Sequence, residues 1–268
     1  GGDEGSTIGA RLRRSCEGLS PTFVKIGQLL STRPDLLPPD ILVELQALQD
    51  AVAPFPFEEA RQLVEEEFGQ PLDQAFASFD PVPLASASIS QVHAAVLPSG
   101  RPVAVKVQRP GVRESIPEDL AILRDLAALL DRHTHLGELY DLSRMVQELE
   151  DALLRELDFA QEGANADTFR KNLAHDKGVR VPEIHWVRTT TRVLTMERIL
   201  GIRPTRPEDL DAAGFDRTLL GQRLATSVAN QILRDGFFHT DPHPGNLLVE
   251  PDGTWVLLDL GQVGRLSA

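Results

Sequence analysis

The stretch SISQVHAAVLPSGRPVAVKVQ, residues 88–108, constrains the fold of this chain more than any other part of the sequence. Two segments typical of β-strands surround Pro98, Ser99 and Gly100, a turn signal that indicates a β-hairpin. Long stretches with helical spacing of apolar residues precede and follow this hairpin. Because strands and helices do not alternate regularly, the order of elements predicts an α+β fold with two lobes rather than a βαβ sheet.

Helices account for most of the remaining predicted structure. The segment that begins at Ser20 has a capping residue and a proline in its first turn, and Pro34 ends it, whereas the first ten residues are expected to form a flexible tail. Further helices are predicted over residues 41–50, 57–69, 114–136, 142–173 and 217–236. Strands are predicted as a pair within residues 181–199, and as two short segments around residues 237–250 and the turn at residues 251–253.

The charge and cysteine content exclude several classes of protein. The chain has 268 residues and a net charge of −13, and a surface of that sign repels nucleic acid, so nucleic acid is not expected as a partner. A single cysteine, Cys16, rules out an internal disulfide framework and a cysteine-rich zinc site. No apolar run approaches the ~20 residues of a membrane span, so a soluble protein of the cytoplasm is the default expectation.

A lone lysine, Lys106, lies among small apolar residues in the second strand of the predicted hairpin. One interpretation places it on an exposed edge, where most such lysines lie. The alternative is a lysine that binds phosphate in a cleft, which would require a carboxylate partner. Glu156, Asp158 and Glu162 offer carboxylates, although such acidic runs usually form a solvated face. Asp158 and Glu162 are predicted to project from one side of a helix because they are four residues apart.

Acidic and amide side chains recur near the C-terminus, in HTDPHPGN and in DLG. Asp241, Asn246 and Asp259 surround a predicted hairpin and offer the hard oxygen ligands that Mg²⁺ prefers beside substrate phosphates. Phosphoryl transfer needs one further carboxylate to orient the acceptor. Zinc is the weaker alternative, because His239 and His243 could supply ligands but no second histidine cluster completes a set.

Together these segments resemble the UbiB-type atypical protein-kinase-like family, also called aarF-domain kinases, from about residue 15 to the C-terminus. Five motifs carry the resemblance in the family's order: FVKIGQLLSTRPDLLP, PLASASISQVH, VAVKVQRPG, RELDFAQEGAN, and HTDPHPGN with DLG. The first is similar to the family's KxGQ signature (Lys25, Gly27 and Gln28), and the fourth contains its ExD motif (Glu156 and Asp158). Generic kinases lack both of these motifs.

The resemblance implies a two-lobed, kinase-like fold that binds ATP or ADP with Mg²⁺ between its lobes. Lys106 would contact the nucleotide phosphates and pair with Glu162. Asp241 would take the catalytic-loop position, and Asn246 and Asp259 would ligate Mg²⁺. The other nucleotide-binding positions implied by the match belong to an alanine-rich loop and to the hinge that receives adenine: Ala85, Ser86, Ala87, Ser88, Met196, Glu197 and Arg198.

The resemblance also implies how the chain is divided. A helical extension with the KxGQ motif would occupy residues 1–78 and lie over the cleft, with Lys25 reaching the ExD carboxylates. The N-lobe with inserted helices would occupy residues 79–200, and the start of the C-lobe residues 201–268. Because the chain ends shortly after DLG, where family members continue, we expect a truncated C-lobe and assign any membrane association to a longer form of the protein.

The family is associated with isoprenoid-quinone biosynthesis and lipid metabolism at membranes. Because the family's KxGQ helix packs over the cleft where a protein substrate would otherwise dock, the resemblance implies ATPase activity or a small-molecule role rather than protein phosphorylation. The partners implied are a quinone precursor or lipid, quinone-biosynthesis proteins, or a membrane surface. Two alternatives stay open: a pseudokinase-like module that binds nucleotide or lipid and acts without turnover, and a small-molecule phosphotransferase. The KxGQ and ExD motifs argue against the second alternative.

Overall fold

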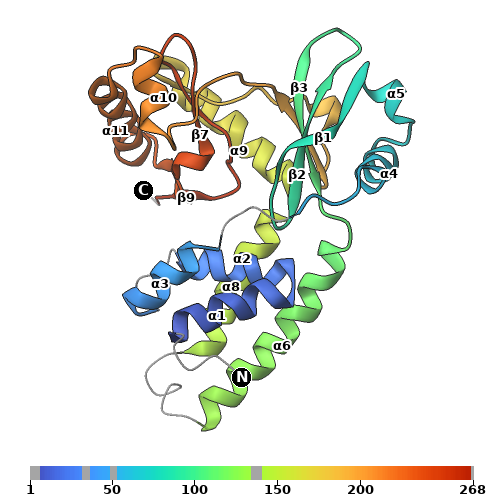
Figure 1. The fold of residues 1–268 in the computed structure, drawn as a ribbon, viewed down its shortest axis with the longest axis vertical. Helices are drawn as coiled ribbons and strands as arrows, with labels where there is room; N and C mark the ends of the chain where they lie inside the picture. The colour runs from blue at the N-terminus through green and yellow to red at the C-terminus, as the bar shows by residue number, and fades with distance from the viewer. Residues whose placement is uncertain (1–6, 32–36, 49–52, 134–140, 267–268) are drawn as a thin grey trace. The chain divides into compact units, whose positions relative to one another are not determined.

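The computed structural model describes residues 7–31, 37–48, 53–133 and 141–266 (Figure 1). Helices and strands are mixed along the chain, which confirms the predicted α+β class. The chain divides into two compact units, the first made of Gly1–Leu63, Pro81–Val92 and Val107–Leu157, the second of Val64–Asp80, His93–Lys106 and Asp158–Ala268. The division predicted with boundaries after residues 78 and 200 stays a prediction, as does the position of the Lys25 helix over a cleft.

Three helices at the start of the first unit pack around a small apolar core. They are α1 (Ile8–Leu19), α2 (Pro21–Ser31) and α3 (Pro39–Gln46). Thr7 caps α1 by accepting a hydrogen bond from the N–H of Ala10 at 3.2 Å, so residues 8–10 are helical and the flexible tail predicted for them is wrong. The helix predicted over residues 41–50 ends earlier, and its last two residues lie outside the described part. The core consists of Cys16, Val24, Leu45 and Leu48.

Two longer helices of the first unit, α6 (Val112–His133) and α8 (Leu142–Glu156), pack against each other and against α2. The helix predicted over residues 114–136 is confirmed as far as α6 is described. Among the described helices, none is both long and apolar enough to cross a bilayer. Buried residues of α2, α6, α8 and the loop before β2 form a second core: Ile26, Ile89, Val112, Ile116, Leu120, Leu153 and Leu157.

The single helix predicted over residues 142–173 is wrong, because the chain breaks after α8 and begins a new helix, α9 (Phe159–Asn172). Asp158 lies at the break and accepts hydrogen bonds from two N–H groups in the first turn of α9, at 3.0 and 3.2 Å. A carboxylate that caps the backbone in this way offers the N–H groups an alternative to the continuing helix. The spacing of leucines, on which the prediction was based, carries no information about such capping. Asp158 is therefore the N-cap of α9 and does not share a helical face with Glu162.

A four-stranded sheet has the strand order β1-β2-β3-β5. β2 (Ser90–Val96) and β3 (Pro102–Gln108) form the hairpin predicted around Pro98, Ser99 and Gly100. The strands before and after it are β1 (Ser78–Ser86) and β5 (Val193–Glu197), and two short helices, α4 (Phe57–Phe68) and α5 (Leu72–Ala75), precede β1.

Two strand predictions differ from the structure. β1 begins before the predicted change of pattern at Pro83, and it contains prolines because an edge strand tolerates residues that cannot donate to the ladder. Of the two strands predicted within residues 181–199, only β5 forms as a strand. Ile184 makes an isolated bridge with Met196 of β5, and a 3₁₀ turn (Trp186–Arg188) lies between Ile184 and β5.

The rest of the second unit carries short strands and two helices, α10 (Pro207–Ala212) and α11 (Arg217–Leu233). β4 (Val179–Arg180), β8 (Trp255–Leu257) and β7 (Leu247–Val249) form one sheet, and β6 (Phe237–His239) pairs with β9 (Val263–Arg265). β7 and β8, which pair antiparallel, are the strands predicted on either side of the turn at residues 251–253. Gly201 lies so close to β7 that a Cβ there would be 2.7 Å from the carbonyl oxygen of Val249. The core of this unit includes Phe159, Phe169, Leu194, Trp255, Leu257 and Leu260.

Candidate functional site

Lys106 lies where three elements of the second unit meet. Its Nζ is 2.7 Å from Oε2 of Glu162 on α9 and 3.8 Å from Oδ2 of Asp259, which follows β8. The ring centroid of Phe159, the first residue of α9, is 5.0 Å from the same Nζ. Only 14% of the lysine side chain is exposed, so the interpretation of Lys106 as a solvated edge residue does not fit the structure.

Burial shapes the electrostatics of this cluster. Glu162 is almost fully buried, and burial raises the pKa of its carboxyl to about 7, while the Lys106 ammonium acts in the opposite direction and the Asp259 carboxylate adds to the rise. The ionised form of Glu162 therefore depends on its ion pair with Lys106. Asp259 differs from Glu162 because 47% of its side chain is exposed, and its Oδ1 accepts a hydrogen bond from the N–H of Gly261 at 3.1 Å.

Helix α9 positions both the glutamate and the segment after β8. Asp158 starts the helix, which places Glu162 in its first turn, where a negative charge is favoured by the helix dipole. One turn later, the buried Asn165 donates a hydrogen bond from Nδ2 to the carbonyl oxygen of Leu260 at 2.9 Å. Asn165 thereby fixes the backbone next to Asp259. The sequence analysis did not single out Asn165, because its partner is a backbone carbonyl group 95 positions away.

The histidines of HTDPHPGN bind the backbone of their own loop. His239 is buried at the end of β6, and its Nδ1 accepts a hydrogen bond from the N–H of Asp241 at 3.0 Å. Burial lowers the pKa of His239, which keeps the ring neutral and able to accept. Nδ1 of His243 likewise accepts from the N–H of Gly245 at 3.1 Å. These contacts favour a scaffold role, and within the described ranges no group of three or more His, Cys, Asp and Glu side chains could hold a metal ion.

Asn246 and Asp259 provide a donor set that suits Mg²⁺. The carbonyl oxygen of Asn246 accepts a hydrogen bond from the N–H of Leu258 at 2.9 Å, so the two segments are tied together one residue before Asp259. Nδ2 of Asn246 donates to the carbonyl oxygen of Asp241 at 3.4 Å. An amide oxygen and a carboxylate are hard ligands, and Mg²⁺ commonly takes few protein ligands because water and phosphate complete its octahedron.

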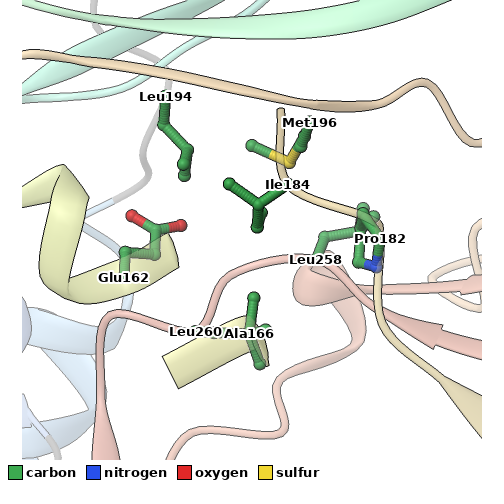
Figure 2. A pocket seen from close by; sticks show the side chains of 8 residues that line it. All are labelled: Glu162, Ala166, Pro182, Ile184, Leu194, Met196, Leu258 and Leu260. Carbon is green, nitrogen blue, oxygen red and sulfur yellow. The ribbon is translucent and has the colours of Figure 1, made fainter. Parts of the chain in front are cut away.

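A small apolar cavity in the second unit is lined in part by Glu162, as Figure 2 shows. The Glu162 carboxylate is its one charged lining group, and the other walls are aliphatic side chains, a proline and the thioether of Met196. This space holds no more than about one water molecule, which is far smaller than a pocket for a small-molecule ligand. Its lining residues are Glu162, Ala166, Pro182, Ile184, Leu194, Met196, Leu258 and Leu260.

Of the three predicted hinge residues, Met196 alone is among those that line this cavity. The carboxylate of Glu197 accepts two hydrogen bonds from Arg180, at 2.8 and 3.0 Å. Arg180 also donates to both carboxylate oxygens of Glu250 at 2.7 Å. Although burial alone would raise the pKa of Glu197, these hydrogen bonds outweigh it and lower that pKa. The N–H of Arg198 donates to the carbonyl oxygen of Pro102 at 3.5 Å.

Lys25 of the KxGQ motif meets Glu156 of the ExD motif within the first unit, whereas Asp158 caps α9. Nζ of Lys25 is 2.8 Å from Oε2 of Glu156, whose side chain is nearly buried. Gln28 donates from Nε2 to the carbonyl oxygen of Leu48 at 3.2 Å, and a Cβ at Gly27 would overlap Cδ1 of the same leucine. The lysine of the motif therefore forms an ion pair, while the glycine and glutamine fix the chain after α3.

The alanine-rich loop connects β1 to β2. Ser86 is the last residue of β1, and Ala87 donates from its N–H to the carbonyl oxygen of Ser90 at 2.8 Å, which closes a tight turn. Ala85 is exposed, whereas Ser88 is buried. Sequence reasoning did not single out the arginine that follows β3, Arg109, although its side chain contacts this loop.

Several known proteins are similar to this chain in sequence or in fold. A family described as ABC1 atypical kinase-like domain matches residues 47–268. Protein sll1770 of Synechocystis, described as uncharacterized, is 44% identical over 257 residues, which cover 96% of this chain and 44% of that protein. A probable protein kinase UbiB of Xanthomonas campestris is 45% identical over 270 residues, which cover 97% of this chain and 48% of that protein.

A solved structure, that of Rv3197 from Mycobacterium tuberculosis in complex with erythromycin, matches with a TM-score of 0.69 and 30% identity over 95% of this chain and 64% of that one. The chain spans about half the length of the curated relatives described above. These matches confirm the kinase-like fold and the family that the motifs predicted. The chain belongs to the ABC1 atypical kinase-like domain family.

Proposed function

We propose that this chain binds ATP or ADP with Mg²⁺ and acts as an atypical kinase-like ATPase that supports isoprenoid-quinone biosynthesis or related lipid metabolism. The observation that carries the proposal is the placement of Lys106 between Glu162 and Asp259. A fixed ammonium next to an accessible carboxylate matches what a metal-bound polyphosphate requires. The adenine ring would lie near Met196, at the hinge position that the family resemblance implies.

The proposal assigns a role to each residue of the site. Lys106 binds the phosphate oxygens, and Glu162 holds the lysine in position through its ion pair. Asn246 and Asp259 would hold Mg²⁺, which neutralises phosphate charge when it is bound. Asp241, whose backbone is fixed by His239, orients the acceptor oxygen, which belongs to water in hydrolysis or to a small-molecule hydroxyl in transfer.

The partners follow from the same proposal. A quinone precursor or lipid would be the acceptor or the molecule moved, and quinone-biosynthesis proteins or a membrane surface would bind the protein. Relatives named probable protein kinase UbiB support the assignment to a kinase-like class. The Lys25–Glu156 ion pair supports a specialised role for the KxGQ helix. The proposal connects that helix with ATP hydrolysis rather than with phosphorylation of a protein.

The proposal is tested by measuring release of ADP with and without Mg²⁺, a phenolic quinone precursor and anionic lipid vesicles. We expect wild-type protein to release ADP only with Mg²⁺, and Asp259→Asn to lower the rate at least about 100-fold, because a metal ligand is lost. Asp125→Asn, on the exposed side of α6, is the matched control and keeps the wild-type rate. Nucleotide binding without any turnover would instead support a binding module.

A further inference from the structure

Two side chains of α9 hold the backbone of Leu260 by both of its polar groups. Nδ2 of Asn165 donates to the Leu260 carbonyl oxygen at 2.9 Å. Burial dominates the raised pKa of Glu162, and a hydrogen bond from the Leu260 backbone acts in the opposite direction. Because a carboxylate can only accept, the backbone group bound to Glu162 is the Leu260 N–H. Glu162 and Asn165 are three residues apart and therefore lie on one face of α9.

The amide of Asn165 is itself held in one orientation. Gln161, one turn earlier on α9, donates from Nε2 to Oδ1 of Asn165 at 3.0 Å. This bond engages the oxygen of the amide and leaves Nδ2 for the carbonyl group of Leu260. Asn165 is 2% exposed, so water has little access to its donor. All of these residues belong to the second unit, as do Lys106 and Asp259.

Leu260 lies in the segment that carries the proposed metal ligand Asp259. Residues 258–262, between β8 and β9, form neither helix nor strand. The segment is tied at its start to HTDPHPGN, because the N–H of Leu258 donates to the carbonyl oxygen of Asn246 at 2.9 Å. Asp259 directly follows that bond and directly precedes the residue that α9 holds. Its place is therefore set from both sides by bonds to the backbone of its neighbours.

The same helix also positions the lysine of the cluster. The Glu162 carboxylate that accepts from the Leu260 N–H is 2.7 Å from Nζ of Lys106. Lys106 Nζ in turn lies 3.8 Å from Oδ2 of Asp259. Mg²⁺ demands a nearly ideal octahedron with short bonds, so a carboxylate that is displaced or mobile binds it less well. A half-exposed carboxylate such as that of Asp259 gains most when its backbone is held in advance.

We propose that Asn165 is a positioning residue for the metal, which keeps the Asp259 carboxylate in reach of a nucleotide-bound Mg²⁺ by holding the Leu260 carbonyl group. The inference rests on the proposed nucleotide function. Asn165 does not bind the metal itself, because its amide oxygen accepts from Gln161 and its nitrogen donates to Leu260. Without Asn165 a buried carbonyl group loses its donor, and the arrangement of Asp259 that suits Mg²⁺ becomes less populated.

The test compares the dissociation constant of ADP in Mg²⁺ with that in the chelator EDTA, measured by calorimetry or with a fluorescent ADP analogue. Asn165→Leu removes the donor at nearly constant volume. Gln161→Leu, at an exposed position, keeps the donor but removes the bond that orients it. Trp255→Phe is the matched control, because Nε1 of Trp255 also donates to a carbonyl oxygen within the second unit, that of Leu220 on α11 at 2.9 Å.

We expect Asn165→Leu to weaken ADP binding about 10-fold in Mg²⁺ and less than about 2-fold in EDTA, because Lys106 keeps its place while the metal ligand does not. Gln161→Leu should change the ratio of the two constants in the same direction by about 2- to 3-fold, since the donor stays but is less well oriented. Trp255→Phe should leave the ratio unchanged. Circular dichroism checks that each variant is folded, and Gln161→Leu decides the matter if Asn165→Leu is not.

The two ways of failing are distinguishable. If Mg²⁺ strengthens ADP binding to wild type, but Asn165→Leu weakens binding equally in both media or in neither, Asn165 is a structural residue and the proposed nucleotide function stands. If wild-type protein does not bind ADP, or binds it equally well with and without Mg²⁺, the proposed binding of nucleotide with Mg²⁺ fails, and the role of Asn165 fails with it.

Discussion

At Gly27 the lack of a side chain has a specific packing role. A Cβ at this position would overlap Cδ1 of Leu48 and would lie 3.5 Å from Sγ of Cys16. The next residue, Gln28, donates to the carbonyl oxygen of the same leucine at 3.2 Å. Two adjacent residues of the KxGQ motif therefore fix the chain after α3, while Lys25 pairs with Glu156 at 2.8 Å. The motif thus combines a packing role and an electrostatic role within one turn of helix.

This packing role predicts the effect of Gly27→Ala. The added methyl group must displace Leu48, which is 4% exposed, and overpacking of this kind costs about 1–3 kcal/mol of the free energy of unfolding. Gly18→Ala on α1 is the control, because a Cβ there meets nothing within 4 Å and should stabilise the helix by about 0.5–1 kcal/mol. Denaturant unfolding of both variants measures the difference, and equal stability of the two would contradict this role.

At the scale of elements, one arginine connects three strands of the second unit. Arg180 on β4 binds Glu197 at the end of β5 and Glu250 just after β7, with four hydrogen bonds between 2.7 and 3.0 Å. These hydrogen bonds raise the pKa of Arg180 far above its ordinary value, so the charge is permanent. The clamp lies between the strand that carries Met196 and the hairpin that carries Asn246, and it holds both sides of the candidate site in register.

Arg180→Met is expected to leave two carboxylates without their shared cation. Because the pairs are bidentate but about one third exposed, the free energy of unfolding should fall by about 1–2 kcal/mol, and less in high salt. Arg144→Met, which removes an exposed i,i+4 pair with Glu148, should change it by less than about 0.5 kcal/mol. Thermal or denaturant unfolding at two salt concentrations checks this, and a loss no larger than that of the control would argue against the clamp.

At the scale of the whole molecule, local sequence signals predicted the elements and the family but not the break in the long helix. The β2–β3 hairpin could be predicted because Pro98, Ser99 and Gly100 are turn residues in sequence. The α8–α9 break could not, because apolar spacing continues up to Asp158 and capping depends on the backbone conformation there. The start of β1 was not predicted, because prolines argue against a strand in sequence. A strand accepts prolines at the edge of a sheet, and only the strand order shows that β1 lies there.

In the candidate site too, residues within local motifs could be predicted, whereas residues whose partners are far away in sequence could not. Lys106, Glu162, Asn246 and Asp259 were found because they lie in motifs. Other contributors act through backbone groups distant in sequence, as Asn165 does with a residue 95 positions away. Arg180 likewise meets Glu250 across 70 positions, and Arg109 meets Ala53 across 56. Such pairs have no signature in a single sequence, because the partner is a carbonyl group or a carboxylate that any fold could supply.

The central claim is that the Lys106 cluster binds a nucleotide together with Mg²⁺, and calorimetric titration of ADP into wild-type protein and Lys106→Met tests it most directly. We predict saturable, Mg²⁺-dependent binding to wild type and binding at least about 10-fold weaker to the variant, since a desolvated ammonium–phosphate contact contributes at least 1.4 kcal/mol, or about 10-fold. No binding to wild type, or equal affinity in a folded Lys106→Met variant, would contradict the claim.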